Sequence, residues 1–165
     1  MEKIEKLKKI FKREGLDGYV IPKNDEFFGE YIPDHNDRLN FISSFSGSYG
    51  LALILKDKNY LFVDGRYTLQ ANNQSETNFK VITIPDKMPS DILRRKKLLI
   101  GFDPNLFTRK SLSIFFGKSE CKYKPILKNL IDEIWKRKIK NNVNKFFRLP
   151  AGSVCEKYQS KTYKI

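Results

Sequence analysis

The tetrapeptide Asp64-Gly65-Arg66-Tyr67 contains the residue types best able to do chemistry in this sequence. It follows the apolar run 60–63 and precedes a stretch that favours a helix. A carboxylate at this position can interact with the dipole of that helix, and an acid, a glycine and an arginine between a strand and a probable helix mark a place where a function could lie. The structural alternative is an ion pair between Arg66 and Asp64 or a nearby helix end, and the residues alone leave both interpretations open.

The only histidine, His35, lies among Asp34, Asn36 and Asp37. Histidine beside carboxylates could form a metal or acid–base site, but a structural metal site needs about four ligands at suitable spacing. No third protein ligand is spaced to complete the set. A surface helix start, with Asp34 or Asn36 as the N-terminal cap, is the simpler interpretation.

The segment 43–50 is rich in serine and glycine and could be taken for a phosphate-binding loop. It lacks the lysine of a P-loop and does not match the dinucleotide-binding glycine pattern. Gly47 and Gly50 more simply allow the backbone to turn into a strand.

The elements that would position these residues alternate between helix and strand. The apolar runs 49–55 and 60–63, separated by the polar turn 56–59, predict a hairpin. Apolar residues at helical spacing predict a helix over 2–14, which Gly15 would end. Further strands are expected at 16–21, 79–84, 98–104 and 121–126, and further helices at 38–45, 66–75, 108–117 and 127–135, with a loop and short helix at 86–95. This order predicts an α/β fold.

Composition indicates an ordinary globular chain. The 165 residues favour one domain, with 40% hydrophobic and 31% charged residues. No apolar run approaches the roughly 20 residues that span a bilayer, and the charged start of the chain does not resemble a secretory signal. Cys121 and Cys155 form no metal-binding pair, so a reduced cytoplasmic setting is expected, although a disulfide stays open.

The basic charge lies mainly in residues 92–165, which hold 19 basic and 5 acidic residues. Phe146 and Phe147, beside Lys145 and Arg148, would suit a nucleic-acid surface. Lysines scattered over a solvated face would give the same charge without any nucleic-acid ligand. We favour this interpretation.

Several stretches together resemble the amino-terminal domain of Xaa-Pro aminopeptidases (aminopeptidase P), within the creatinase/prolidase group. The resemblance covers about residues 4–136 in consistent order. The stretches that carry it are Glu30-Tyr31-Ile32, Asp37-Arg38-Leu39, Phe41-Ile42-Ser43, Phe45-Ser46-Gly47-Ser48-Tyr49-Gly50, Asp64-Gly65-Arg66-Tyr67, Gly101-Phe102-Asp103-Pro104 and Asn129-Leu130-Ile131-Asp132-Glu133-Ile134-Trp135.

The resemblance implies a mixed sheet of about five to six strands flanked by helices, of the ribonuclease-H-like kind, over residues 1–136. Residues 137–165 would then be a linker or the truncated start of a second domain. In the family, a separate C-terminal domain performs metal-assisted hydrolysis. That domain binds two metal ions, often manganese, through two Asp, two Glu and a His. This sequence shows no such set, so no cofactor is expected within it.

By resemblance, the chain is expected to be a non-catalytic domain that assists assembly and substrate-cleft formation, and to be inactive alone. Arg66 is the candidate that reaches toward the cleft. The residues expected to shape the motif structurally are Asp64, Gly65, Tyr67, Gly47 and Gly50. Expected partners are a separately encoded catalytic domain or a second copy of the chain, with no membrane. The alternatives are a stand-alone interaction module, a vestigial product or, less in keeping with the sequence, a nucleic-acid-binding protein.

Overall fold

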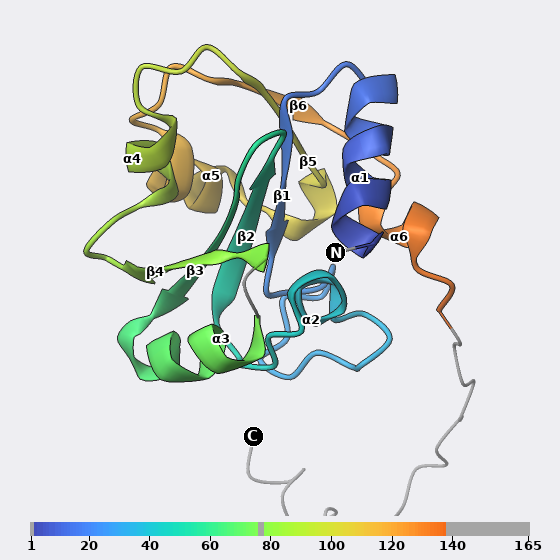
Figure 1. Cartoon of the computed structure of the whole chain (residues 1–165), viewed down its shortest axis with the longest axis vertical. Helices are drawn as coiled ribbons and strands as arrows, with labels where there is room; N and C mark the ends of the chain where they lie inside the picture. The colour runs from blue at the N-terminus through green and yellow to red at the C-terminus, as the bar shows by residue number, and fades with distance from the viewer. Residues whose placement is uncertain (1, 76–77, 138–165) are drawn as a thin grey trace, which may run out of the picture.

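A computed structural model describes residues 2–75 and 78–137 and contains a six-stranded sheet in the order β4-β3-β2-β1-β5-β6 (Figure 1). The strands are β1 (Gly18–Pro22), β2 (Gly50–Leu55), β3 (Asn59–Asp64), β4 (Lys80–Ile84), β5 (Leu99–Phe102) and β6 (Lys122–Pro125). The predicted mixed sheet and α/β class are therefore confirmed.

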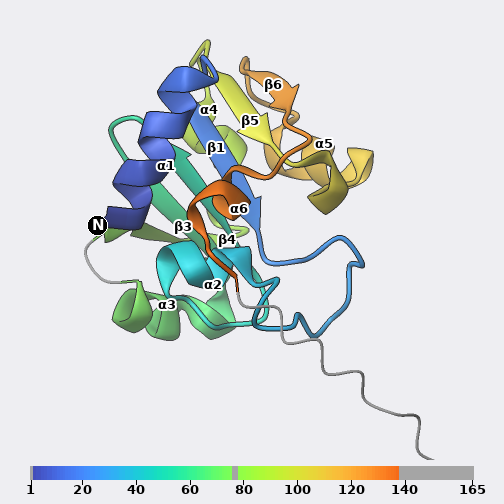
Figure 2. The same ribbon diagram turned by 90° about the vertical axis from the view of Figure 1, so that its right-hand side faces the viewer.

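Strand direction decides which loops come together. β1, β5 and β6 run parallel to one another, as do β3 and β4, whereas β2 is antiparallel to both of its neighbours. All strands except β2 therefore end at the same edge of the sheet, which we call the carboxyl edge. The loop 23–37, the loop 44–49 that enters β2, and the motif 64–67 all meet there (Figure 2).

One face of the sheet is covered by α1 (Glu2–Arg13), α2 (Arg38–Ser43), α3 (Thr68–Gln74) and α6 (Leu130–Ile134). Its core includes Leu7, Phe11, Leu39 and Phe45, all fully buried. The apolar residues of α1 recur at helical spacing because they share the side that packs on the sheet. The chain leaves this helix through Gly15, whose φ of 67° is in the left-handed region that glycine tolerates.

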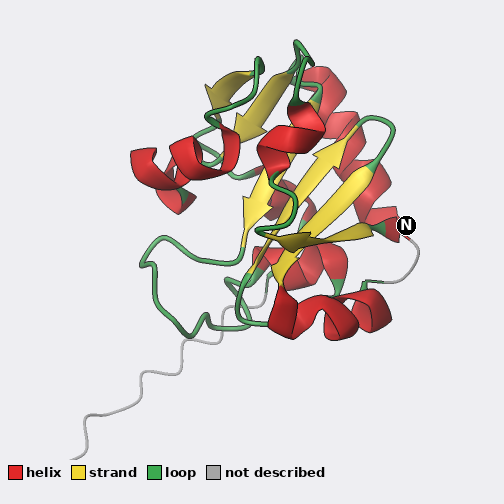
Figure 3. Cartoon of the chain, turned by 90° about the vertical axis from the view of Figure 1, so that its left-hand side faces the viewer, coloured by secondary structure: helices red, strands yellow, loops and turns green. Residues whose placement is uncertain are grey.

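The other face is covered by α4 (Pro89–Leu93) and α5 (Arg109–Phe116), and Figure 3 shows helices on both sides of the strands. Phe62, Ile100 and Phe116 are among the buried residues here. Thr108 caps α5 by accepting a hydrogen bond from the Ser111 backbone N–H at 3.0 Å. Among the described residues, no helix is long and apolar enough to cross a membrane.

Three helix ends differ from the sequence prediction by two or more residues. α2 ends at Ser43, because Ser44 turns into the left-handed region with φ 61°. A 3-10 turn, η1 (Gly65–Tyr67), precedes α3, so the α-helix begins at Thr68 rather than at Arg66. The last helix begins at Leu130 rather than at residue 127, because Asn129 caps it by accepting from the Ile131 backbone N–H. Another 3-10 turn, η3 (Pro104–Leu106), follows β5.

The predicted linker 137–165 lies outside the described residues except for Arg137, and so do Cys155 and the Phe146–Phe147 pair. The predicted boundary near residue 136 stays a prediction. Cys121, the cysteine within the described part of the chain, is half-buried and has a free thiol. That thiol lies 3.1 Å from the carbonyl oxygen of Lys96.

Candidate functional site at the carboxyl edge

Asp64 shapes the motif that follows β3. Its backbone is extended, and its Oδ1 atom accepts a hydrogen bond from the Arg66 backbone N–H at 2.9 Å. This bond satisfies a donor that the start of the 3-10 turn leaves unpaired. The prediction that Asp64 lies at a helix N-terminus is thus confirmed, and the turn directs Arg66 away from the core.

The side chains of Arg66 and Asp64 also form an ion pair. The Arg66 Nη2 atom lies 2.7 Å from Asp64 Oδ2, and Nε lies 3.2 Å from Oδ1. The hydrogen bonds from Arg66 lower the pKa of the Asp64 carboxyl, and the same bonds raise the pKa of Arg66. The Arg66 side chain is 76% exposed. An exposed pair of this kind contributes little to stability. Because most of the Arg66 side chain is exposed, its guanidinium is accessible to a second anionic group.

Tyr67 connects the motif to the serine- and glycine-rich loop. Its ring meets the ring of Phe45 edge-on, with centroids 5.9 Å apart. Its hydroxyl lies 2.7 Å from Ser48 Oγ. A Cβ atom on Gly50 would lie 3.1 Å from Phe45 Cε1, so the glycine lets the backbone pass close to this ring. The loop therefore packs as part of the motif rather than forming a phosphate cradle.

Gly47 and Gly65 offer a matched pair of substitutions within this region. A Cβ atom at Gly47 would lie 2.2 Å from Phe45 Cζ and 2.9 Å from Tyr67 Cδ1. Because both rings are packed, we expect Gly47→Ala to lower the free energy of unfolding by about 1–3 kcal/mol. Urea unfolding followed by circular dichroism measures this change.

Gly65→Ala is the control, because a Cβ atom there would meet no atom within 4 Å. We expect its unfolding midpoint to stay close to that of the parent chain. Equal destabilisation by the two substitutions would contradict the packing argument. Nothing inside the described residues explains why residue 65 is a glycine.

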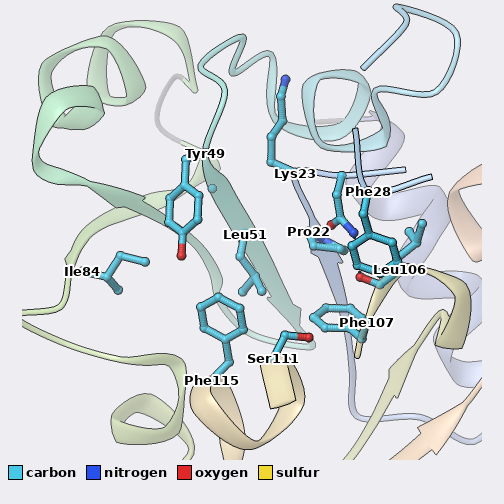
Figure 4. Close-up of a pocket in the computed structure, with 12 residues that line it drawn as sticks. Pro22, Lys23, Phe28, Tyr49, Leu51, Ile84, Leu106, Phe107, Ser111 and Phe115 are labelled. Atoms are coloured by element: carbon cyan, nitrogen blue, oxygen red, sulfur yellow. Dashed lines mark hydrogen bonds between the residues drawn. The ribbon is translucent and has the colours of Figure 1, made fainter. Parts of the chain in front are cut away.

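Beside the motif, the carboxyl edge holds an apolar groove of about 210 Å³ (Figure 4). We call it the carboxyl-edge groove. The apolar residues that line it are Pro22, Phe28, Tyr49, Leu51, Ile84, Leu106, Phe107 and Phe115. They come from β1, β2, β4 and α5 and from the loops after β1, before β2 and after β5, which is why no single stretch of sequence predicts it.

Comparison with known proteins identifies the fold and its relatives. Residues 3–126 match the family model described as the creatinase/prolidase N-terminal domain. The chain belongs to this family. The match covers the sheet, the motif and the groove, so the family predicted from the sequence is confirmed.

The relatives of this creatinase/prolidase N-terminal domain are much longer proteins. A probable Xaa-Pro aminopeptidase P from Coprinopsis cinerea is 36% identical over an alignment of 139 positions, which covers 78% of this chain and 22% of the relative. Aminopeptidase P1 from Lotus japonicus is 38% identical over an alignment of 127 positions, which covers 73% of this chain and 19% of the relative. The chain thus spans about a fifth of the length of the curated relatives that it matches.

Solved structures agree with this assignment. The X-prolyl aminopeptidase from Caenorhabditis elegans, described as a cytosolic enzyme with a di-nuclear active site, superposes with a TM-score of 0.74 at 32% identity. The superposed region is 83% of this chain and 26% of the C. elegans enzyme. The N-terminal domain of the cytoplasmic peptidase PepQ from Mycobacterium tuberculosis shares the fold, with a TM-score of 0.62 at 21% identity over 81% of this chain and 98% of that one.

The creatinase/prolidase N-terminal domain described here does not fit a metal site. No group of three or more His, Cys, Asp or Glu side chains is placed to hold an ion within residues 2–75 and 78–137. His35 contributes its backbone carbonyl, which accepts a hydrogen bond from Arg137 Nη1 at 3.2 Å.

The surroundings of His35 also correct the predicted helix start. Asp37, rather than Asp34 or Asn36, caps α2, because its Oδ1 atom accepts from the Asn40 backbone N–H at 3.0 Å. Asp37 is buried and pairs with Lys23, and Asn36 is buried beside Asp25. The segment is therefore an internal polar anchor for the loop 23–37 and not a surface helix start.

Arg38 forms a two-point ion pair in this anchor, which the sequence did not indicate. Its Nε and Nη2 atoms lie 2.9 Å and 3.0 Å from the two carboxylate oxygens of Asp132 in α6. Burial alone lowers the pKa of Arg38, but the hydrogen bonds and charge of Asp132 outweigh it and raise the pKa. Arg137 also approaches Asp132, at 2.6 Å. This arrangement joins the base of the loop 23–37 to the last helix of the domain.

Proposed function

We propose that this chain serves as the amino-terminal domain of an Xaa-Pro aminopeptidase, and that Arg66 lends its positive charge to a substrate cleft completed by a separate metal-binding catalytic part. The observation that carries the proposal is the guanidinium of Arg66, which is exposed at the carboxyl edge and held in place by Asp64. Arginine suits this role, because its planar fork binds carboxylate and carbonyl oxygens of a peptide in a fixed geometry.

The length of the relatives supports the proposal that this chain binds substrate while a separate part performs the metal-assisted hydrolysis. The chain matches 19–26% of the aminopeptidases described above, and the C. elegans enzyme is described as having a di-nuclear active site. Two metal ions, often manganese in this family, would activate the attacking water in the catalytic part. The described residues of this chain supply no such ligands. Its contribution would be to bind and orient the substrate.

Partner and location follow from the same proposal. The catalytic part could be encoded separately, and a second copy of the chain could also take part in the assembly. We propose a cytoplasmic location, because the C. elegans relative is described as a cytosolic enzyme.

Activity measurements test the role of Arg66. In a chimaera, the matched quarter of the C. elegans enzyme is replaced by residues 3–137 of this chain. Because a lost charged hydrogen bond is worth about 1.5–3 kcal/mol, we expect Arg66→Ala to lower kcat/KM for an Xaa-Pro peptide about 10- to 100-fold. Arg66→Lys should restore part of the loss, since it keeps the charge without the fork.

Arg109→Ala is the matched control, because Arg109 is also an exposed arginine but lies at the start of α5. It should leave kcat/KM unchanged. Equal kcat/KM for Arg66→Ala and Arg109→Ala would refute the role of Arg66. The 165-residue chain alone, incubated with Mn²⁺ and the same peptide, should release no amino acid, and proline-directed hydrolysis by it would refute the non-catalytic assignment.

A further inference from the structure

We propose that the carboxyl-edge groove is a docking site for an apolar segment of the metal-binding catalytic part of an Xaa-Pro aminopeptidase. The proposal rests on the proposed function and adds a contact surface distinct from Arg66. It concerns assembly of the two parts rather than binding of the substrate.

The chemistry of the groove selects an apolar occupant. Its polar rim is already satisfied within the chain: Asn24 Nδ2 donates to the carbonyl oxygen of Leu106 at 2.9 Å, and Ser111 Oγ donates to the carbonyl oxygen of Thr108 at 2.9 Å. Lys23 is paired with Asp37. These polar groups are already engaged within the chain, and the rest of the lining is apolar, so an apolar side chain would gain most by leaving water here.

The walls of the groove are exposed while its floor is buried. Phe28 and Tyr49 are 50% and 44% exposed, but Leu51 and Leu106 are 1% and 2% exposed. Figure 4 shows the rings of Phe28 and Tyr49 on opposite sides of the opening, with Leu51 between them. An apolar hollow bordered by accessible aromatic side chains is typical of a surface that another protein segment covers.

The backbone at Phe28 gives independent support. Its φ of 53° lies in the left-handed region, which is unfavourable for a bulky side chain. Local hydrogen bonds hold it there: the Phe28 N–H donates to the carbonyl oxygen of Asp25 at 3.2 Å, and the Asp25 carboxylate accepts from the Phe27 N–H at 3.1 Å. A strained backbone that presents an aromatic ring to solvent points to a function at that position.

The position of the groove identifies the partner. It opens at the carboxyl edge, where Arg66 also lies, because β1, β3, β4 and β5 all end there. A catalytic part that completes a cleft with Arg66 must approach this edge and would cover the neighbouring groove. In these relatives, about three-quarters or more of the length lies outside the matched region, and such a segment can come from there. These two facts favour the catalytic part over a second copy of the chain.

Hydrogen exchange in the chimaera tests the docking. We expect the backbone amides of residues 23–28 and 48–50 to exchange at least 10-fold more slowly in the chimaera than in the 165-residue chain. The double variant Phe28→Ser/Tyr49→Ser should abolish this protection. Ile114→Ser is the control, since Ile114 is 57% exposed on α5 and does not line the groove.

Each outcome decides the proposal. Unchanged exchange at the groove, or equal protection in the double variant and the Ile114 control, would overturn it.

If the chimaera does not fold, the 165-residue chain is mixed with the separately produced catalytic part. Absence of protection at the groove in that mixture is equally decisive against docking. Protection that rises with the concentration of the 165-residue chain alone would assign the groove to a second copy. If the groove is protected in the chimaera but Arg66→Ala leaves kcat/KM unchanged, the docking proposal stands and the proposed function of Arg66 is refuted.

Discussion

Replacing Arg38 with methionine is expected to lower the free energy of unfolding by about 3 kcal/mol, because Asp132 loses the buried arginine that binds both of its oxygens and keeps only Arg137. The Arg38 side chain is only 6% exposed, and it binds both carboxylate oxygens of Asp132. Methionine keeps most of the volume, so the change reports the lost charge and hydrogen bonds. Equilibrium urea unfolding, followed by circular dichroism, gives the difference.

Arg13→Met is the control for this prediction. Arg13 also forms an ion pair with a residue of α6, Glu133 at 2.9 Å, but its side chain is 58% exposed. We expect a loss of less than about 1 kcal/mol, as is usual for exposed pairs. The explanation fails if the two arginine variants lose equal stability. The variant Arg38→Met/Asp132→Leu should recover part of the loss, since it also removes the carboxylate that has lost its buried partner.

Phe45→Ala is the second change with a large expected effect. The ring is fully buried, and it packs beside Tyr67, Gly47 and Gly50. Removing it leaves a cavity between the loop 44–49 and the motif 64–67, so we expect a loss of about 3–5 kcal/mol. The same urea titration measures it, and NMR spectra should show shifts at Tyr67 and Ser48.

Two further variants test the reason given for Phe45. Phe45→Leu retains much of the apolar volume and should cost about 1–2 kcal/mol. Phe27→Ala removes a ring that is 79% exposed and should leave the unfolding midpoint nearly unchanged. If Phe45→Ala destabilised the chain no more than Phe27→Ala, the ring would not be supporting the motif.

Local sequence patterns predicted the elements well where the signal is contained in a few neighbouring residues. The apolar spacing of Ile4, Leu7 and Phe11 predicted α1, and Gly15 ends it with the expected left-handed backbone. The hairpin of β2 and β3 was predicted from two apolar runs and a polar turn. The motif residue Asp64 lies where it was expected, because a capping carboxylate acts within two residues of its own position.

Features that depend on residues far apart were missed. Arg38 and Asp132 are 94 positions apart, so nothing near either residue indicates their pairing. The groove likewise draws Phe28, Tyr49 and Phe115 from separate parts of the chain. The cap of α2 was assigned to Asp34 or Asn36 instead of Asp37, because several adjacent side chains can cap and only the backbone direction decides among them.

The packing of α1 against α6 has a consequence for synthesis on the ribosome. Arg13 and Glu133, which join these helices, lie at opposite ends of the described chain, and β1 pairs with β5 about 80 residues later. The β2–β3 hairpin can form from neighbouring residues, whereas such long-range contacts wait until the whole domain has emerged. A nascent chain that stalls before residue 130 would therefore expose the apolar side of its first helix to chaperones and proteases.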